Sequence, residues 1–353
     1  MNMKMPLPKY LDTASTTPVD SRVKDAMLPY FNEIFGNASS NHIYGKQAKE
    51  AIEKSREKVA RIINAETNEI IFTSGATEAI NLGIKGYWES NREEGNHIIT
   101  VKTEHKAVLE TCKYLETLGV EVTYLGVDEN GIISLEELER SIRVDTILIS
   151  VMYVNNEIGV IQEIPRIGEL ARENNVAFFC DATQAVGKIP VDVQKDNIDM
   201  LCMSAHKFNG PKGVGALYLK HGIKISPQIH GGGQEKGLRA GTLNTPLIVG
   251  LGEIANIAFV EYADRIALLQ KERNKWTTYF EGQEQVIIMF KNAVKAPHIL
   301  CFKVNQDAED FLMKNTANFA ASTGSACNSY IVENSHVMRA LNFTLNRTFR
   351  ISF

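Results

Sequence analysis

Between about residues 50 and 220, patterns typical of helices alternate with short apolar runs typical of buried strands. The run ILISVMYV at 147–154 is apolar throughout, as expected for a strand covered on both faces. Strand-like runs occur at 69–73, 97–101, 121–125, 146–151, 177–180, 200–203 and 215–219, and helical patterns at 46–63, 77–88, 106–118, 134–142 and 165–174. This alternation predicts the α/β class, with a mostly parallel sheet in one large domain.

The pattern changes after Gly250. One long helical pattern runs from about Pro246 to Phe280, and an irregular mixture of helix and strand signals follows it. We therefore predict a large α/β domain at 15–249 and a smaller α+β domain made of 1–14 and 250–353. Neither a complete GxGxxG nor a GxxxxGK[ST] motif is present, so nothing favours a dinucleotide or P-loop site.

Charge and hydropathy argue against two classes of protein, those that bind nucleic acid and those that enter a membrane. The formal net charge is −4, and Lys and Arg are scattered rather than gathered in a stripe, which argues against direct binding to nucleic acid. No apolar run approaches the roughly 18–20 residues that span a membrane, and the first ten residues lack the apolar core of a signal peptide. We expect a cytoplasmic protein that does not enter a membrane.

The stretch IIFTSGATEA places small residues, Ser74 to Thr77, between a predicted strand and a predicted helix. Backbone N–H groups at such a helix start can bind an anion, and the helix dipole favours negative charge there. A hydroxyl of Ser74 or Thr77 would add a further donor. The same residues also suit an ordinary helix N-cap, so this motif alone leaves both interpretations open.

Asp181 and Lys207 each follow an apolar run that predicts a strand. They should therefore lie at the carboxyl edge of the sheet, where ligands of α/β proteins bind. A lysine that forms a Schiff base and an acid that keeps a pyridine nitrogen protonated are what pyridoxal 5'-phosphate (PLP) chemistry requires. The alternative is two unrelated loop charges, although Ser204, His206 and Lys207 within four positions are more polar than packing requires.

The five cysteines, at 112, 180, 202, 301 and 327, form no CxxC pair, which argues against a disulfide framework and a zinc site. Four of them occur in apolar or helical surroundings and are expected to be small buried hydrophobic residues. Cys327 differs, because it lies in the small-residue run STGSACNS just before a helical pattern at 333–341. A thiolate near a helix start is nucleophilic, so Cys327 is the candidate reactive thiol.

Seven motifs occur in order along nearly the whole chain from Tyr10: TSGATEA, TEHKAV, NNEIGV, DATQAVGK, AHKFNGPKG, HGGGQEKGLRAGT and TGSACNS. Together they resemble the cysteine desulfurases of the NifS/IscS type, which are class V members of the fold-type I PLP enzymes. The resemblance implies that fold, a homodimer with sites at its interface, and the conversion of L-cysteine to L-alanine with a persulfide on the enzyme. It further implies that GSACNS belongs to the subgroup with a long mobile loop, here about 322–335, that delivers sulfur to a protein acceptor.

The resemblance also assigns roles to individual residues. Lys207 would bind the coenzyme, His105 would move protons, and Cys327 would carry the sulfur. Contacts with the coenzyme are implied for Ala76, Thr77, His105, Asn156, Asp181 (ring nitrogen), Gln184 (ring hydroxyl), Ser204, His206, Lys207 and, from the partner subunit, Thr242. Asn156 and Arg350 would bind the substrate, with Arg350 as the clamp on its carboxylate. No metal is expected.

Two departures from the family pattern bear on the pathway. The segment between Leu341 and Arg350 is shorter than in relatives, the chain stops at Phe353, and 35–45 is one residue shorter. These differences suggest a specialised paralogue that serves DNA phosphorothioation or tRNA thiolation rather than general iron–sulfur assembly. The alternatives are another class V PLP enzyme, such as an aminotransferase or a selenocysteine lyase, and a non-catalytic component of a sulfur-transfer complex.

Overall fold

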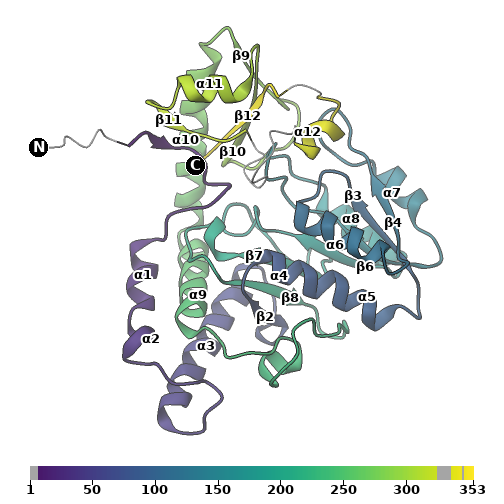
Figure 1. Cartoon of the computed structure of the whole chain (residues 1–353), viewed down its shortest axis with the longest axis vertical. Coiled ribbons are helices and arrows are strands. Elements are labelled where there is room, and N and C mark those ends of the chain that lie inside the picture. The colour runs from purple at the N-terminus through teal and green to yellow at the C-terminus, as the bar shows by residue number, and fades with distance from the viewer. Residues whose placement is uncertain (1–6, 324–334, 344–345) are drawn as a thin grey trace, which may run out of the picture.

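The computed structural model describes residues 7–323, 335–343 and 346–353, and its centre is a seven-stranded sheet (Figure 1). The strand order is β2-β8-β7-β6-β5-β3-β4. The strands are β2 (Ile70–Thr73), β3 (His97–Val101), β4 (Glu121–Leu125), β5 (Thr146–Ser150), β6 (Ala177–Asp181), β7 (Met200–Ser204) and β8 (Gly215–Leu219). Strands β7, β6, β5, β3 and β4 pair in parallel, whereas β8 is antiparallel to both β2 and β7. The predicted α/β class with a mostly parallel sheet is confirmed.

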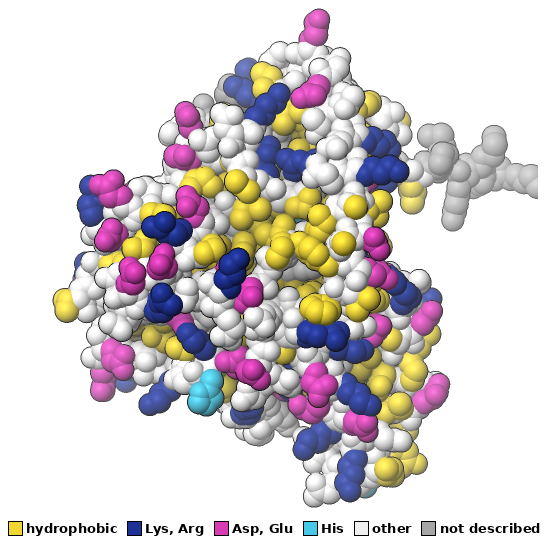
Figure 2. All heavy atoms as spheres, turned by 180° about the vertical axis from the view of Figure 1, so that it is seen from behind, with side chains coloured by type: hydrophobic (Ala, Val, Ile, Leu, Met, Phe, Trp, Pro, Cys, Tyr) yellow, Lys and Arg dark blue, Asp and Glu magenta, His cyan; other side chains and the backbone are white. Residues whose placement is uncertain are grey.

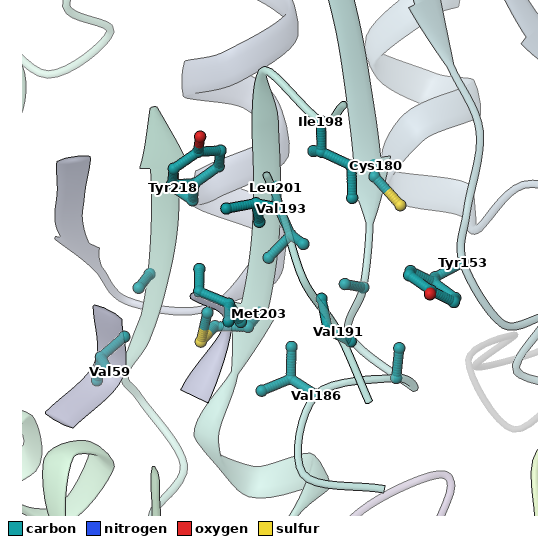
Figure 3. Close-up of a cluster of buried hydrophobic side chains, with 14 of the residues drawn as sticks. Val59, Tyr153, Cys180, Val186, Val191, Val193, Ile198, Leu201, Met203 and Tyr218 are labelled. Carbon is teal, nitrogen blue, oxygen red and sulfur yellow. The ribbon is translucent and has the colours of Figure 1, made fainter. Parts of the chain in front are cut away.

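Helices cover both faces of this sheet, so six of its strands are buried along their whole length, whereas β4 at the edge is partly exposed. One face is covered by α1 (Ser21–Met27), α3 (Ile43–Ile62), α7 (Leu135–Ser141), α8 (Ile164–Glu173) and α9 (Thr245–Val260), and the other by α4 (Ala76–Ile80), α5 (Gly86–Asn91) and α6 (Lys106–Glu116). Side chains alternate between the two cores along each strand, so that Phe178 and Cys180 enter one and Phe179 the other. Figure 3 shows Cys180, Leu201 and Met203 within the first of these cores.

The predicted helix at 77–88 forms, but with a change of pitch in its middle. A π-helical turn at Asn81–Lys85 joins α4 to α5. Gly83 lies in that turn, and a Cβ on it would stand 2.6 Å from the ring of Phe179. The helix therefore approaches the sheet more closely there than a larger residue would allow.

A smaller part of the chain packs around a core of its own, separate from the two cores of the large sheet. It contains α10 (Tyr262–Glu281), α11 (Ala308–Lys314), α12 (His336–Ala340) and a three-stranded antiparallel sheet of β9 (Val286–Ile288), β10 (Ile299–Val304) and β12 (Thr348–Ser352). Stacked rings fill this core, with the centroids of Phe302 and Phe349 5.0 Å apart. The N-terminal arm joins it, because β1 (Lys9–Tyr10) pairs with β11 (Phe319–Ala320) and Leu11 is fully buried there.

The prediction of a single helix over Pro246–Phe280 is wrong in one respect, because the helix is interrupted at Glu261. Helices α9 and α10 meet there at an angle of 81°. Leu251 and Ile254 of α9 pack into the core of the large sheet, whereas Trp276 and Phe280 of α10 pack into the smaller core. A straight helix could not bury both sets of residues, and sequence periodicity does not reveal which core each set faces.

The predicted domain boundary at 249/250 stays a prediction. Helix α9 begins before that boundary and packs along α3 and α1, within the core of the large sheet.

A buried ion pair ties the segment before α9 to the large sheet. Arg56 donates to both carboxylate oxygens of Glu235, at 2.7 and 2.8 Å, and the two side chains are 10% and 1% exposed. Glu235 also accepts a hydrogen bond from the backbone of Phe72. The pair therefore holds the 232–241 segment against β2.

We expect Glu235→Gln to lower the free energy of unfolding by about 3 kcal/mol, because it leaves the Arg56 guanidinium buried without its main counter-charge. Urea unfolding followed by circular dichroism would measure this loss. Glu253→Gln is a matched control, since it breaks the more exposed Lys58–Glu253 pair and should cost less than about 1 kcal/mol. Equal losses for the two variants would contradict the prediction.

On the face opposite to that of Figure 1, basic and acidic side chains are interspersed, and apolar side chains gather in a patch at mid-height (Figure 2). This face therefore carries no continuous basic stripe. Within the described ranges, no single helix has both the length and the apolar character needed to cross a membrane. Helices α9 and α10 meet those criteria only when they are taken together across their bend.

Candidate active site

A cavity of about 540 Å³ opens at the carboxyl edge of the large sheet. Asp181 and Ser204 are the last residues of β6 and β7, and His105 and Asn156 lie on the segments that follow β3 and β5. The N-terminal arm and β12 close the cavity with Ala14–Thr16 and Arg350. Parallel strands bring their ends to one edge, so residues far apart in the sequence meet there.

All the predicted site residues line this cavity except Thr242 and Cys327. Thr242 is exposed in this single chain, and its role in the partner's site stays a prediction. Cys327 and most of the predicted mobile loop lie outside the described residues. The predicted roles of the lining residues also stay predictions, but their arrangement has clear chemical consequences.

One end of the cavity has the features of an anion site. Gly75 precedes α4 with φ 156° and ψ 179°, a conformation essentially restricted to glycine. The turn directs the start of the helix, with Ala76 and Thr77, at the cavity. Ser204 and His206 line the cavity with these residues, and burial lowers the pKa of His206 to about 4, so its ring is neutral near pH 7. These groups suit a phosphate.

The side chain of Lys207 reaches the N-terminal arm, which closes the cavity. Lys207 ends a short 3-10 turn after β7, and its Nζ donates to the carbonyl oxygens of Ala14 and Ser15, at 2.8 Å each. No sequence pattern indicated that this part of the N-terminal arm would reach the site. Its only signal was the polar run TASTTP, which has no periodicity.

Two buried acids, Asp181 and Glu104, interact electrostatically, and of the two only Asp181 lines the cavity. Asp181 accepts hydrogen bonds from the backbone of Thr183, at 2.9 Å, and from the Cys202 thiol, at 3.3 Å. Glu104 is fully buried and accepts from the backbone of Met152. Burial, and next the nearby Asp181, raise the pKa of Glu104 well above its usual value, so Glu104 holds its proton. Asp181 is therefore the acid positioned for a cationic ring nitrogen.

His105 caps α6, and this role determines its tautomer. Its Nδ1 accepts from the backbone N–H of Ala107 at 3.1 Å, so the neutral ring carries its hydrogen on Nε2. The capping of α6 by His105 and its predicted role in proton transfer are compatible, because each uses a different ring nitrogen.

Arg350 is buried in β12 and already has three partners. One terminal nitrogen donates to the carbonyl oxygen of Asn156 at 2.7 Å, and the other donates to Asp12 at 2.6 Å and to Ser15 at 2.8 Å. Its Nε is buried without a hydrogen-bond partner in the part of the chain that the structure describes. A substrate carboxylate would therefore meet an oriented guanidinium and would compete with Asp12 for it.

Helix α12 begins at His336 with Ser335 as its N-cap, and these two residues contact two segments that line the cavity. The Ser335 hydroxyl donates to Glu157, next to Asn156, and His336 contacts the backbone oxygen of Glu104, next to His105, at 2.7 Å. Glu157 is almost fully buried, and burial raises its pKa to about 7. The hydrogen bond from Ser335 and the nearby basic groups lower this pKa, but by less than burial raises it. Glu157 therefore changes its charge near neutral pH.

The raised pKa of Glu157 predicts a pH-dependent effect of Glu157→Gln. Between about pH 4.5 and 7 the folded state keeps the proton that the unfolded state loses, so Glu157 makes the wild type less stable as the pH rises. The variant should therefore gain about 3 kcal/mol relative to the wild type over this interval. Urea unfolding of both proteins at pH 5 and pH 8 would measure the change. A difference independent of pH, as expected for the exposed control Glu163→Gln, would contradict it.

The described cysteines are unsuited to nucleophilic chemistry. Cys112, Cys180, Cys202 and Cys301 are all buried, as the sequence predicted. Burial raises the pKa of Cys112 and of Cys301 to about 12, and those of the other two well above the usual value. Their thiols stay protonated near neutral pH.

Residues 9–353 match the family model described as Aminotransferase class-V. The cysteine desulfurase IscS of Neisseria meningitidis serogroup C is 52% identical over 342 residues, which cover 96% of this chain and 85% of that protein. The chain belongs to the cysteine desulfurases of the class V aminotransferase family. This family is PLP-dependent, and the predicted resemblance is confirmed.

Solved structures agree with this assignment. A NifS-like protein superposes with a TM-score of 0.91 at 37% identity, covering 98% of this chain and 94% of its own. A structure described as SspA in complex with cysteine has a TM-score of 0.88 at 39% identity, with 98% of both chains covered. The predicted fold-type I architecture is therefore confirmed as well.

Proposed function

We propose that this desulfurase binds PLP in the cavity, converts L-cysteine to L-alanine, and carries the released sulfur as a persulfide on Cys327. The observation that supports this most directly is the arrangement of Lys207 and Asp181 in one cavity with a glycine-initiated helix start. PLP has a phosphate that a helix start can bind, an aldehyde carbon that a lysine can bind covalently, and a pyridine nitrogen that an acid can pair with. The 52% identity to a cysteine desulfurase supports the choice of reaction.

The residues present fit the coenzyme. Ala76, Thr77, Ser204 and His206 would hold its phosphate, Asp181 its ring nitrogen and Gln184 its ring hydroxyl. Lys207 would hold it covalently. When bound, PLP withdraws electrons from the α-carbon of the amino acid attached to it.

The chain's own groups would orient the substrate and move its protons. Arg350 would bind the cysteine carboxylate, exchanging its contact with Asp12 for one with the substrate, and Asn156 would complete the pocket. Lys207 would remove the α-proton once it is released from the coenzyme, and His105 would hold or return a proton through Nε2. The buried position of Arg350 strengthens its attraction for a carboxylate.

The sulfur step would use Cys327 as a thiolate nucleophile. Its sulfur attacks the substrate sulfur, an S–S bond forms, and the C–S bond of the substrate breaks. The carbon that loses the sulfur takes up a proton, and the amino acid leaves as L-alanine. In total, L-cysteine and the Cys327 thiol give L-alanine and the Cys327 persulfide.

Mass spectrometry of the PLP-loaded protein after incubation with L-cysteine tests this function. We expect one added sulfur atom on the peptide that contains Cys327, together with alanine in the solution. Alanine without added sulfur on Cys327 would favour a selenocysteine lyase type of activity, and a 2-oxo acid in place of alanine would favour an aminotransferase. A purified protein unable to bind PLP would favour the non-catalytic alternative.

A homodimer and a protein acceptor for the sulfur are part of the proposal. The exposed Thr242 belongs to the same segment as the buried Glu235, so a partner subunit would meet a segment anchored by the Arg56 ion pair. Specialisation for DNA phosphorothioation or tRNA thiolation stays a prediction.

A further inference from the structure

Gln184 lies between the cavity and a buried polar cluster. Its side-chain nitrogen donates to the carbonyl oxygen of Ala14 at 2.9 Å, and its side-chain oxygen lies 3.2 Å from Lys188 Nζ and 3.3 Å from His298 Nε2. Lys188 is in the large part of the chain, one turn beyond Gln184, whereas His298 directly precedes β10. Three distant segments therefore meet at one amide group.

These contacts permit only one orientation of the amide. The carbonyl oxygen of Ala14 accepts hydrogen bonds but cannot donate, so it must face the NH2 group of Gln184. The side-chain oxygen of Gln184 then faces two N–H donors, which occupy both of its lone pairs. One N–H of the amide remains for a partner in the cavity that Gln184 lines.

The two donors to the Gln184 oxygen, Lys188 and His298, are both buried. Their side chains have no role in the proposed reaction, and Lys188 is 5% and His298 0% exposed. Burial, followed by nearby basic groups, lowers the pKa of Lys188 and that of His298 well below the usual values. Neutral His298 has a single N–H, which must be on Nε2 because that atom faces the oxygen of Gln184.

We propose that Lys188 and His298 are positioning residues that lock the Gln184 amide with its NH2 group toward the cavity, where it stabilises the deprotonated ring oxygen of PLP. This inference rests on the proposed function, since it needs the coenzyme in the cavity. A free amide could rotate and bring its own oxygen against the ring oxygen, and two facing acceptors repel each other. The smaller part of the chain thus reaches the coenzyme site through His298.

Absorbance spectra and coenzyme affinity of Lys188→Met and His298→Phe test the proposal. Each variant removes one donor to the Gln184 oxygen. We expect the near-ultraviolet band, from coenzyme whose ring oxygen carries a proton, to grow relative to the visible band, and the Kd for PLP to rise about three- to tenfold. His298→Asn keeps a side-chain N–H and should restore most of the wild-type spectrum. Lys195→Met, at an exposed position nearby, is the control.

A double-mutant cycle separates positioning from a structural role. In a Gln184→Leu background, Lys188→Met should no longer change the spectrum or the Kd, because its effect acts through Gln184. The proposal would be overturned if Lys188→Met left both quantities unchanged, or if its effect persisted without Gln184. Melting temperatures of the PLP-free variants show whether a spectral change merely follows a loss of stability.

The same experiment distinguishes this inference from the proposed function. Wild-type protein that binds PLP and forms the Cys327 persulfide, together with an unchanged Lys188→Met spectrum, would overturn the inference alone. Wild-type protein that binds no PLP would overturn both.

Discussion

Lys207→Ala should lower alanine formation from cysteine by about 10³-fold or more and should release PLP on gel filtration. Lys207 is the lysine whose Nζ lies in the cavity between the strand ends and the N-terminal arm, at 2.8 Å from Ala14 O and Ser15 O. Its loss removes both the covalent attachment of the coenzyme and the base for the α-proton. Alanine assays and the PLP content of the purified protein measure these two effects.

Two comparisons make the Lys207 result specific. Lys224→Ala changes an exposed lysine and should keep both activity and coenzyme. Added methylamine should restore part of the activity of Lys207→Ala, because a small amine can replace the missing base. A Lys207→Ala protein that turns over cysteine as fast as wild type would refute the assignment.

Cys327→Ala should keep its PLP but lose the persulfide, with alanine formation also reduced by about 10³-fold or more. No described cysteine is expected to replace it, since Cys112, Cys180, Cys202 and Cys301 are buried and their raised pKa values keep the thiols protonated. The coenzyme contacts predicted for the cavity do not involve Cys327, so its absorbance spectrum should remain. Mass spectrometry and alanine assays would measure the loss.

Cys112→Ala is the matched control for Cys327→Ala, because it removes a thiol that lies on α6 and packs into the core of the large sheet. It should form the persulfide at a rate near that of wild type. Persulfide on any of the four buried cysteines in Cys327→Ala would contradict the assignment of the reactive thiol.

Much of the fold was predictable because its signals are local. Strand-like runs identified all seven strands of the large sheet to within one residue at either end. Six of these strands are buried on both faces, which favours mostly apolar sequences. The positions of Asp181 and Lys207 just after such runs predicted that both lie at the carboxyl edge of the sheet. Motif order added the family, which the comparisons confirm.

Other predictions remain as the sequence left them. The role of Thr242 requires a partner subunit, Cys327 lies outside the described residues, and the cytoplasmic location and the domain boundaries stay predictions.

The sequence by itself determined the α/β class, the family and the residue types gathered at the site, because strand periodicity and motif order depend on neighbours along the chain. Only the tertiary structure decided that Ala14 and Ser15 hold Lys207, that Asp12 pairs with Arg350, and that Lys188 and His298 orient Gln184. These contacts join residues up to 338 positions apart. Hydrogen bonds and charges act over a few ångströms of space, so such partners leave no periodic trace in the sequence.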